Sequence, residues 1–181
     1  MNDNIVTASK YLSLLLRHKP EVIGLSLDTE GWAEIAQIVR LTAERRTPLT
    51  KRLIEEITAT SDKKRFVISE DGTRIRANQG HSIAVDLNLK PQNPPEILFH
   101  GTATRFLESI LRQGLIKGNR HHVHLSPDSA TALKVGQRHG KPVILSIAAQ
   151  AMQSSGYIFF LSANGVWLTE HVPAKFINEL P

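Results

Sequence analysis

The first 60 residues place their apolar side chains at the three- and four-residue spacing of amphipathic helices. Three segments have this spacing: residues 7–19, which stop before Pro20, residues 31–41 and residues 50–59. Thr50 opens the third segment, where a threonine oxygen can accept a hydrogen bond from a free N–H group of the first turn. The pattern predicts three helices, the first of which carries Arg17 and His18 at its C-terminal end.

The period changes to two after the third segment. Residues 65–68 and 74–77 are predicted as short strands and flank Asp71-Gly72, a dipeptide typical of tight β-hairpin turns. Helices followed by a hairpin predict a small winged-helix lobe. This shape often binds nucleic acid but also serves as plain scaffold, so the pattern leaves both uses open.

A proline-rich segment separates this lobe from the rest of the chain. Residues 87–96 contain three prolines and no apolar period, which predicts a boundary near residue 90 and two domains, 1–90 and 91–181. One helix is predicted over 105–113, and a second after Ser126-Pro127, interpreted as an N-cap followed by proline at the first helical position. The predicted strands are 97–100, 123–125, 143–147, 158–161 and 166–169. The fold class is therefore α+β.

Composition narrows the classes of function. The 22 Lys and Arg side chains outnumber the 17 Asp and Glu side chains, which favours polyanionic partners. There is no cysteine, which excludes disulfides, thiolate metal sites and cysteine nucleophiles. No apolar stretch is long enough to cross a bilayer, and the first residues lack the pattern of a secretory signal. We therefore expect a soluble cytoplasmic protein with no membrane partner, and no obligate protein partner is evident.

Several common chemistries lack their motifs. The chain has neither GxxxxGK[ST] nor GxGxxG, so a nucleotide would be bound by another arrangement, and no serine lies in a GxSxG turn. His121, His122 and His124 suggest a metal site, since residues two apart on a strand share a face. No HExxH motif or nearby carboxylate completes a ligand set, and we expect no metal.

Charged and polar side chains gather beside short apolar runs in three segments. These are RIRANQGHS at 74–82, LFHGT at 98–102 and RHHVHLSPD at 120–128. Half-buried charged donors cost free energy unless an anion or a carboxylate binds them. The pattern favours strand ends that open onto an anion-binding cleft, and solvated strand ends are the simpler alternative for any one segment.

The chain resembles a known family through an ordered set of short motifs: LLLRHKP, KKRF, IRANQGHS, FHGT, RHHVHLS and VGQRHGKPV. From residue 8 to residue 172 it is similar to the KptA/Tpt1 family of NAD-dependent RNA 2′-phosphotransferases. The resemblance implies a winged-helix, RNA-binding lobe over 1–90 and an NAD-binding lobe similar to ADP-ribosyltransferases over 91–181. The implied partner is RNA with an internal 2′-phosphate, for which a tRNA from splicing is one candidate.

The family's catalytic Arg-His-Arg-Arg group carries over to Arg17, His18, Arg65 and Arg120, each within its motif. Guanidinium groups can bind phosphate through two parallel hydrogen bonds, so the resemblance implies that these arginines hold the RNA 2′-phosphate. Simpler explanations exist. Arg17 and His18 favour the negative end of a helix, Arg65 can be a solvated hairpin residue, and Arg120 can belong to a basic loop. His18 is a candidate for proton transfer, as acid or as base.

The resemblance also implies a set of NAD contacts. In this interpretation Gly101 lets the backbone approach the nicotinamide amide, and His100 reaches the adenosine-side ribose. His124 lies against the nicotinamide ribose, with a half-buried structural histidine as the alternative, and Arg138 binds a phosphate. The full set is Arg76, Asn78, Gln79, Gly80, His81, Ser82, His100, Gly101, Thr102, His124, Ser126 and Arg138.

The implied reaction has two steps. An oxygen of the RNA 2′-phosphate attacks C1 of the nicotinamide ribose and expels nicotinamide. The ribose 2-hydroxyl then attacks phosphorus, which leaves 2′-hydroxyl RNA and ADP-ribose 1″,2″-cyclic phosphate.

Two other functions stay open from the sequence. An ADP-ribosyltransferase of the more usual type would stop after the first step, but residues 164–168 lack the glutamate that many such enzymes carry on a late strand. A non-catalytic winged-helix nucleic-acid binder would give Arg17 and His18 no special purpose.

Overall fold

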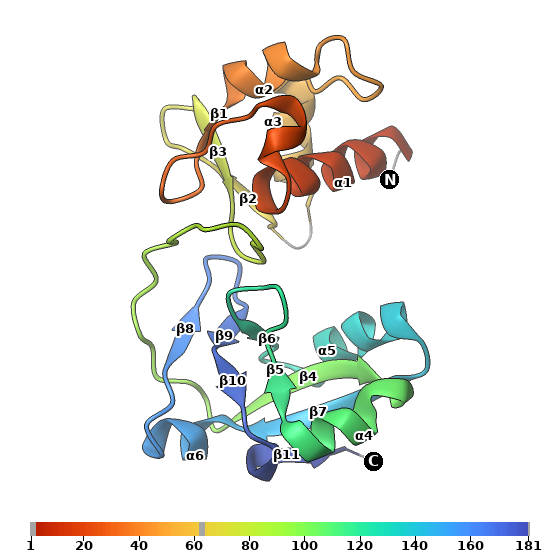
Figure 1. Cartoon of the computed structure of the whole chain (residues 1–181), viewed down its shortest axis with the longest axis vertical. Coiled ribbons are helices and arrows are strands. Elements are labelled where there is room, and N and C mark those ends of the chain that lie inside the picture. The colour runs from red at the N-terminus through yellow and green to blue at the C-terminus, as the bar shows by residue number, and fades with distance from the viewer. Residues whose placement is uncertain (1–2, 62–63, 181) are drawn as a thin grey trace. The chain divides into compact units, whose positions relative to one another are not determined.

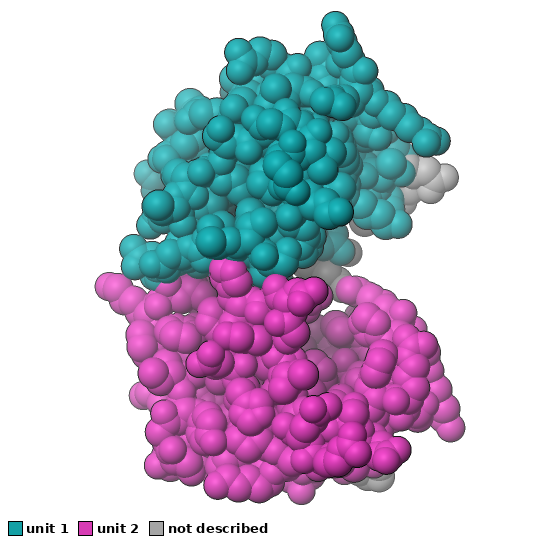
Figure 2. Space-filling model, viewed as in Figure 1, with its two compact units in different colours: residues 1–88 teal, residues 89–181 magenta. Residues whose placement is uncertain are grey.

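The computed structural model describes residues 3–61 and 64–180, which combine helices and strands along the whole chain (Figure 1). The α+β class predicted from the sequence is confirmed. The chain divides into two compact units between Asn88 and Leu89 (Figure 2). Each unit has an apolar core of its own, and we call residues 1–88 unit 1 and residues 89–181 unit 2.

Unit 1 places helices on a small antiparallel sheet. The sheet has the strand order β1-β3-β2, and its buried residues share one apolar core with those of the helices. The elements of unit 1 are α1 (Asp3–Arg17), the 3₁₀ helix η1 (Pro20–Ile23), β1 (Ala33–Glu34), α2 (Ile35–Thr42), α3 (Lys51–Thr60), β2 (Phe66–Ile68) and β3 (Arg74–Ala77).

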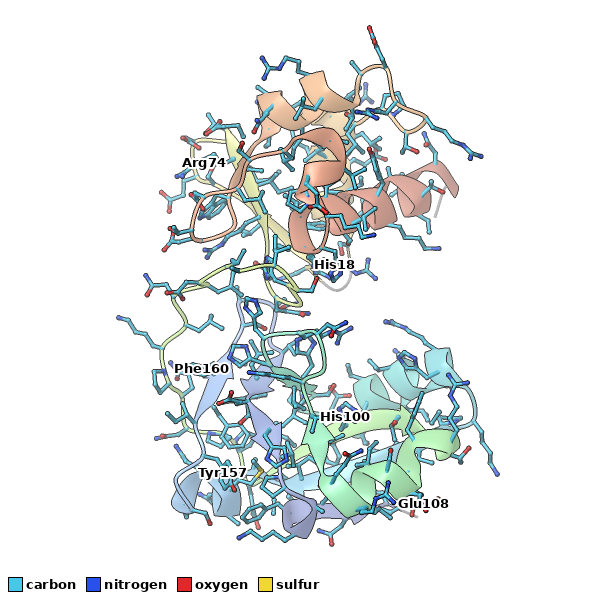
Figure 3. All side chains as sticks on the ribbon, viewed as in Figure 1. His18, Arg74, His100, Glu108, Tyr157 and Phe160 are labelled. Atoms are coloured by element: carbon cyan, nitrogen blue, oxygen red, sulfur yellow. The ribbon has the colours of Figure 1, made fainter. Side chains whose placement is uncertain are left out.

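Local sequence sets the C-terminal end of α1 and the N-terminal end of α3. α1 ends at Arg17 because Pro20 starts η1 only three residues later, and His18 therefore lies directly after the helix (Figure 3). At the start of α3, the Leu53 N–H donates to Oγ1 of Thr50 over 3.2 Å, which confirms the predicted N-cap.

The second predicted helix is wrong over its first four residues. Ala33 and Glu34 form β1, which pairs with Ile75 and Arg74 of β3, and α2 begins only at Ile35. Gly31, the first of these four residues, is also outside the helical conformation, since its φ is 81°. Pairing with a strand far along the chain, which local spacing does not show, decides the conformation here.

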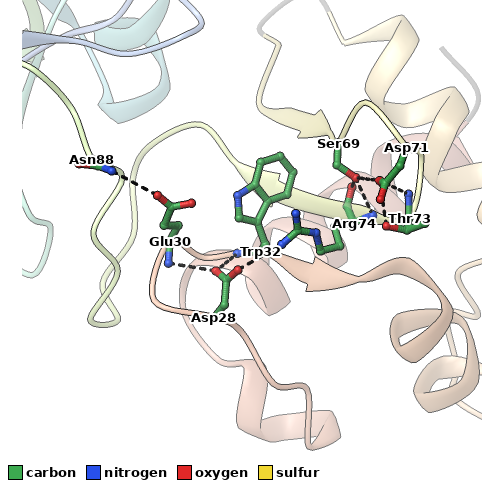
Figure 4. A network of polar contacts seen from close by, with 8 residues as sticks. All are labelled: Asp28, Glu30, Trp32, Ser69, Asp71, Thr73, Arg74 and Asn88. Atoms are coloured by element: carbon green, nitrogen blue, oxygen red, sulfur yellow. Dashed lines mark hydrogen bonds and ion pairs between the residues drawn. The ribbon is translucent and has the colours of Figure 1, made fainter.

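The β2–β3 hairpin is confirmed, and its turn is held by one carboxylate. Asp71 accepts hydrogen bonds from Oγ of Ser69 at 2.6 Å and from the Thr73 backbone N–H and hydroxyl at 3.1 and 2.9 Å (Figure 4). These bonds, with that from Ser69 the strongest, lower the pKa of Asp71 from 3.8 to about 2. Gly72 supplies the positive φ, 70°, that the turn requires.

The described part of unit 2 contains three small antiparallel sheets with strand orders β11-β7-β4, β6-β9-β8 and β10-β5. Their buried faces, together with α4 and α6, enclose the second core. The elements are β4 (Ile97–Ala103), α4 (Thr104–Gln113), β5 (Leu115–Ile116), β6 (Val123–Leu125), α5 (Ser129–Gly136), the 3₁₀ helix η2 (Gln137–His139), β7 (Pro142–Ala148), α6 (Ala149–Ser154), β8 (Phe159–Leu161), β9 (Trp167–Thr169), β10 (His171–Val172), the 3₁₀ helix η3 (Ala174–Phe176) and β11 (Ile177–Glu179).

A two-bond bridge joins β4 to the end of β6. The Phe99 N–H donates to the Ser126 carbonyl over 2.9 Å, and the Ser126 N–H donates back to the Phe99 carbonyl over 2.8 Å. Ser126 is therefore occupied by this bridge, and the predicted N-cap at Ser126 with Pro127 as first helical residue is wrong. Asp128 is the N-cap, since its carboxylate accepts from the Thr131 N–H over 2.7 Å.

Candidate active site

In unit 1, residues 78–82 hold the end of α1 next to the start of β2. The Ser82 N–H donates to the Arg17 carbonyl over 2.9 Å, and the Asn78 N–H donates to the Arg65 carbonyl over 2.9 Å. The Asn78 side-chain amide also donates to the Lys64 carbonyl, at 2.5 Å. One short segment thus fixes the positions of two arginines that are far apart in the sequence.

The Arg17 side chain spans the gap between these two elements. Its Nη2 donates to the Arg65 carbonyl over 3.3 Å, and its guanidinium carbon lies 5.7 Å from the centre of the Phe66 ring. Arg17 and Arg65 are both half-buried, so their charges are partly desolvated. Partly desolvated guanidinium groups bind an anion more strongly than fully hydrated ones.

His18 is oriented by Ser82. Nδ1 of His18 lies 2.9 Å from Oγ of Ser82, and both side chains are exposed. The same residue therefore binds the α1 terminus twice, through its backbone N–H at Arg17 and through its hydroxyl at His18. The sequence predicts Ser82 as an NAD contact. The structure shows that Ser82 also holds the end of α1.

A groove of about 510 Å³ adjoins the cluster. His18 and Arg65 line it together with side chains from α1 and from the C-terminal end of α3. Two of the sequence-predicted catalytic residues therefore face a space that can hold a ligand.

The remaining predicted residues of 74–82 have other surroundings. The Arg76 guanidinium carbon lies 4.6 Å from the centre of the Trp32 ring, and that of Arg74 lies 5.4 Å from it. Arg74 also pairs with the Asp28 carboxylate at 3.6 Å (Figure 4). Cation–π contact with Trp32 holds the Arg76 guanidinium, and the sequence did not predict this aromatic partner. The buried Nε of Arg76 has no hydrogen-bond partner in the described part of the chain, so its contact with a ligand stays a prediction. Of the others, Asn78 and His81 are buried, and Gln79 and Gly80 are half-buried.

In unit 2, three predicted residues meet through hydrogen bonds at β4 and β6. Nδ1 of His100 lies 3.0 Å from the His124 carbonyl, and Nη1 of Arg120 lies 3.3 Å from Nδ1 of His124. A carbonyl only accepts and a guanidinium only donates. His100 therefore carries its proton on Nδ1, and His124 accepts at Nδ1 and presents an N–H at Nε2.

The pKa of the His100 ring is lowered from the ordinary histidine value of 6.5. Burial lowers its pKa most, the hydrogen bond to the His124 carbonyl acts in the opposite direction, and the charges of Arg120 and His139 lower it further. A neutral ring protonated on Nδ1 leaves Nε2 as an acceptor. Such an acceptor suits a hydroxyl group, and a ribose carries two of them. Nε2 of His100 can therefore accept a hydrogen bond from a hydroxyl group of a ligand.

Gly101 has a structural explanation inside unit 2. A Cβ at this position would overlap the Ala132 carbonyl group of α5, and a Cβ at Gly136 would lie 2.6 Å from the Thr102 carbonyl. The two glycines let β4 and α5 pack backbone to backbone. This close packing accounts for the glycine of the FHGT motif without a nicotinamide amide beside it.

The last predicted residues of unit 2 lie at the ends of elements. Thr102 is buried on β4, Ser126 is half-buried and forms the bridge to Phe99, and Arg138 is exposed on η2. His139, next to Arg138, influences the His100 ring electrostatically. Our prediction missed His139, although it lies within the VGQRHGKPV motif.

Within residues 3–61 and 64–180, no three His, Cys, Asp or Glu side chains gather where they could hold a metal ion. Among the helices of the same residues, none is both long and apolar enough to span a membrane.

Comparison with known proteins agrees with the motifs. Residues 3–171 match the family model described as RNA 2′-phosphotransferase, Tpt1/KptA family. The chain belongs to the Tpt1/KptA family. It is 53% identical over 180 residues to a probable RNA 2′-phosphotransferase of Acaryochloris marina, with 99% of both chains covered. A protein of the same description from Rhodopirellula baltica is 56% identical over 175 residues, which cover 96% of this chain and 95% of the relative. One from Agrobacterium fabrum is 56% identical over 170 residues, with 94% and 91% covered.

Proposed function

We propose that this Tpt1/KptA-family protein is an RNA 2′-phosphotransferase that uses NAD as its second substrate. The observation that carries the proposal is the cluster of unit 1, in which residues 78–82 hold Arg17, His18 and Arg65 together. Two half-buried guanidinium groups beside an imidazole form a receptor for a dianionic phosphate. Membership of the family and the names of the relatives support the same activity.

The fold proposed for each unit follows from its element order. Unit 1 places α2, α3 and an antiparallel hairpin in succession and adds β1 at the sheet edge, an arrangement similar to winged-helix lobes. For unit 2 we propose an ADP-ribosyltransferase-like lobe, supported by small antiparallel sheets joined at Phe99 and Ser126.

In the first proposed step, a phosphate oxygen of the RNA 2′-phosphate bonds to C1 of the nicotinamide ribose, and the bond from C1 to the nicotinamide nitrogen breaks. The phosphate is already ionised, so it needs little help from a general base. The task of Arg17 and Arg65 is to hold it in line for attack.

In the second step, the neighbouring ribose 2-hydroxyl attacks phosphorus, and the bond between phosphorus and the RNA 2′-oxygen breaks. The hydroxyl proton ends on the RNA 2′-oxygen. Charge on the phosphoryl oxygens must be stabilised while this happens, which is the proposed task of Arg17, Arg65 and Arg120. His18, with Ser82 at its Nδ1, is placed to move the proton.

For NAD we propose the residues of unit 2 that meet at β4 and β6. His100 would accept a hydrogen bond from a ribose hydroxyl at Nε2, and His124 would donate one from Nε2. Arg138 is proposed for a phosphate of the dinucleotide. The contact of Gly101 with nicotinamide is not needed to explain this glycine, and we propose none. The substrate RNA carries an internal 2′-phosphate, a tRNA splice product being one candidate, and the proposed place of action is the cytoplasm.

The direct test incubates the protein with NAD and a short RNA that bears one internal 2′-phosphate, with products resolved by mass. The expected products are 2′-hydroxyl RNA, nicotinamide and ADP-ribose 1″,2″-cyclic phosphate in equal amounts. The same RNA without the 2′-phosphate is the control and should leave NAD intact. RNA that stays ADP-ribosylated would instead support a transferase that stops after the first step. Failure to consume NAD with any acceptor would support a non-catalytic nucleic-acid binder.

A further inference from the structure

The groove beside His18 and Arg65 is larger than a phosphate group requires. Its volume of about 510 Å³ lies within the range of about 300–1,000 Å³ that small-molecule sites occupy. A phosphate held at Arg65 would fill only the end of the groove where His18 and Arg65 lie. The remaining space extends between α1 and the C-terminal end of α3.

Both polar and aliphatic side chains line the remaining space, a combination that suits a nucleotide. Its polar side chains are those of Ser9, Lys10, Ser13, Thr60 and Ser61. Aliphatic side chains of α1 and α3, such as Leu14 and Ile57, complete the walls. Hydroxyls and a lysine are common ligands of the sugar-phosphate backbone, and an aliphatic wall can cover the face of a base.

The polar groups are spaced along α1 so that they follow one direction. Ser9, Ser13 and Arg17 are separated by four residues each and share one side of the helix. Lys10 is exposed beside Ser9. A chain whose phosphate is held near the C-terminal end of α1 can therefore continue along this side toward Lys10.

We propose that this groove binds the nucleotide next to the 2′-phosphorylated one, with Lys10 at its backbone phosphate. The proposal rests on the proposed function, because it takes the phosphate at Arg65 and His18 as the point from which the RNA continues. The proposal adds a second RNA contact, which only an RNA longer than one nucleotide can make. This contact depends little on which base the nucleotide carries. The enzyme would accordingly distinguish a 2′-phosphate inside a polynucleotide from one on an isolated nucleotide.

The test measures binding without NAD by competition against a fluorescent RNA of seven nucleotides with a central 2′-phosphate. The competitors are a nucleoside 2′-phosphate, the dinucleotides that extend it on the 5′ or the 3′ side, and the unlabelled RNA. The variants are Lys10→Ala and Ser13→Phe, which fills the groove. Lys51→Ala is the matched control, because Lys51 is an exposed lysine of α3 that pairs with Glu55 outside the groove.

We expect Lys10→Ala and Ser13→Phe to weaken the seven-nucleotide RNA and one of the two dinucleotides at least fivefold. The nucleoside 2′-phosphate should change less than twofold, and Lys51→Ala should leave all ligands within twofold. Loss of one backbone contact should also reduce the slope of log affinity against log salt by about 0.7 for Lys10→Ala.

Two results would overturn the proposal. One is an equal loss for the nucleoside 2′-phosphate and the longer RNA, which would mean that the variants act only through the phosphate site. The other is no loss for any ligand. If the wild-type protein binds the seven-nucleotide RNA equally well with and without its 2′-phosphate, the proposed function itself fails.

Discussion

The candidate sites of the two units differ in the side chains that form them. Unit 1 holds thirteen Lys and Arg against twelve Asp and Glu, whereas unit 2 holds nine against five. The basic balance of the chain therefore comes mostly from unit 2, yet the clustered guanidinium groups Arg17 and Arg65 lie in unit 1. The clustering is fixed by the hydrogen bonds of residues 78–82, so the net charge of a unit does not show where its arginines gather.

The hydrogen bonds of the two sites also differ in kind. In unit 1 they hold charged side chains beside a groove of about 510 Å³. In unit 2 they fix the proton positions of two histidines, and burial lowers the pKa of one of them, His100. A charged receptor suits a phosphate and neutral donors and acceptors suit ribose hydroxyls, which is the basis of the proposed division of tasks between RNA and NAD.

The largest effect is expected from loss of a guanidinium group in unit 1. Arg65→Ala should reduce the rate of 2′-phosphate removal about 100- to 1,000-fold, the cost typical of removing one preorganised donor to a charged transition state. Arg74→Ala is the control, because Arg74 is a half-buried arginine of the neighbouring strand β3 that pairs with Asp28. Single-turnover kinetics with saturating NAD measure the rate. Equal losses in both variants would contradict the assignment to Arg65.

In unit 2, a substitution at Gly101 tests close packing instead of charge. Gly101→Ala forces a Cβ into the Ala132 carbonyl and should lower the free energy of unfolding by about 3 kcal/mol, at the upper end for overpacking. Gly118→Ala has open space around its Cβ and a φ of 59°, so it should cost only about 1 kcal/mol. Thermal unfolding without NAD measures both. An unchanged Gly101→Ala stability with a raised KM for NAD would restore the nicotinamide explanation.

A substitution at Ser82 tests whether this residue positions His18 or binds NAD. If Ser82 positions His18, Ser82→Ala should lower kcat about fivefold, the effect of one ordinary hydrogen bond. The KM for NAD should not change, and Ser82→Thr should restore most of the rate. A raised KM for NAD with unchanged kcat would instead show that Ser82 belongs to the NAD site.

The smallest effect concerns the hairpin turn at Asp71. Its carboxyl pKa is lowered from 3.8 to about 2 in the folded chain, so the charge stabilises the fold above pH 3.8, and that stability is lost as the pH falls toward 2. The Tm of Asp71→Asn should be slightly below that of the wild type at pH 7, and the gap should close between pH 4 and pH 2. A gap independent of pH would mean that the charge of Asp71 contributes nothing.

Local features of the fold could be predicted from the sequence, and features set by distant pairing could not. The Thr50 N-cap and the Asp71-Gly72 hairpin depend on neighbouring residues and were predicted correctly. Residues 33 and 34 were predicted as helix because their pairing with β3 lies outside any local window. Short elements such as β5, β10, α6 and β11 are below the length at which periodicity can be recognised.

The same limit applies to the candidate site. The resemblance names Arg17, His18, Arg65 and Arg120, but the segment that fixes the first three emerges only from the hydrogen bonds of Ser82 and Asn78. The close packing of Gly101 depends on α5, which follows it by a helix and two strands. The proton positions on His100 and His124 follow from which atoms they contact and from whether those atoms donate or accept hydrogen bonds.

The division of tasks is tested most directly by calorimetric binding of each substrate alone to two variants, Arg65→Ala and His100→Gln. The first ligand is an RNA with one internal 2′-phosphate, which stays intact because NAD is absent, and the second is NAD. We predict that Arg65→Ala loses affinity for the RNA and keeps its affinity for NAD, whereas His100→Gln does the reverse. Loss of NAD affinity in Arg65→Ala together with full RNA affinity would contradict the assignment of phosphate to unit 1 and of NAD to unit 2.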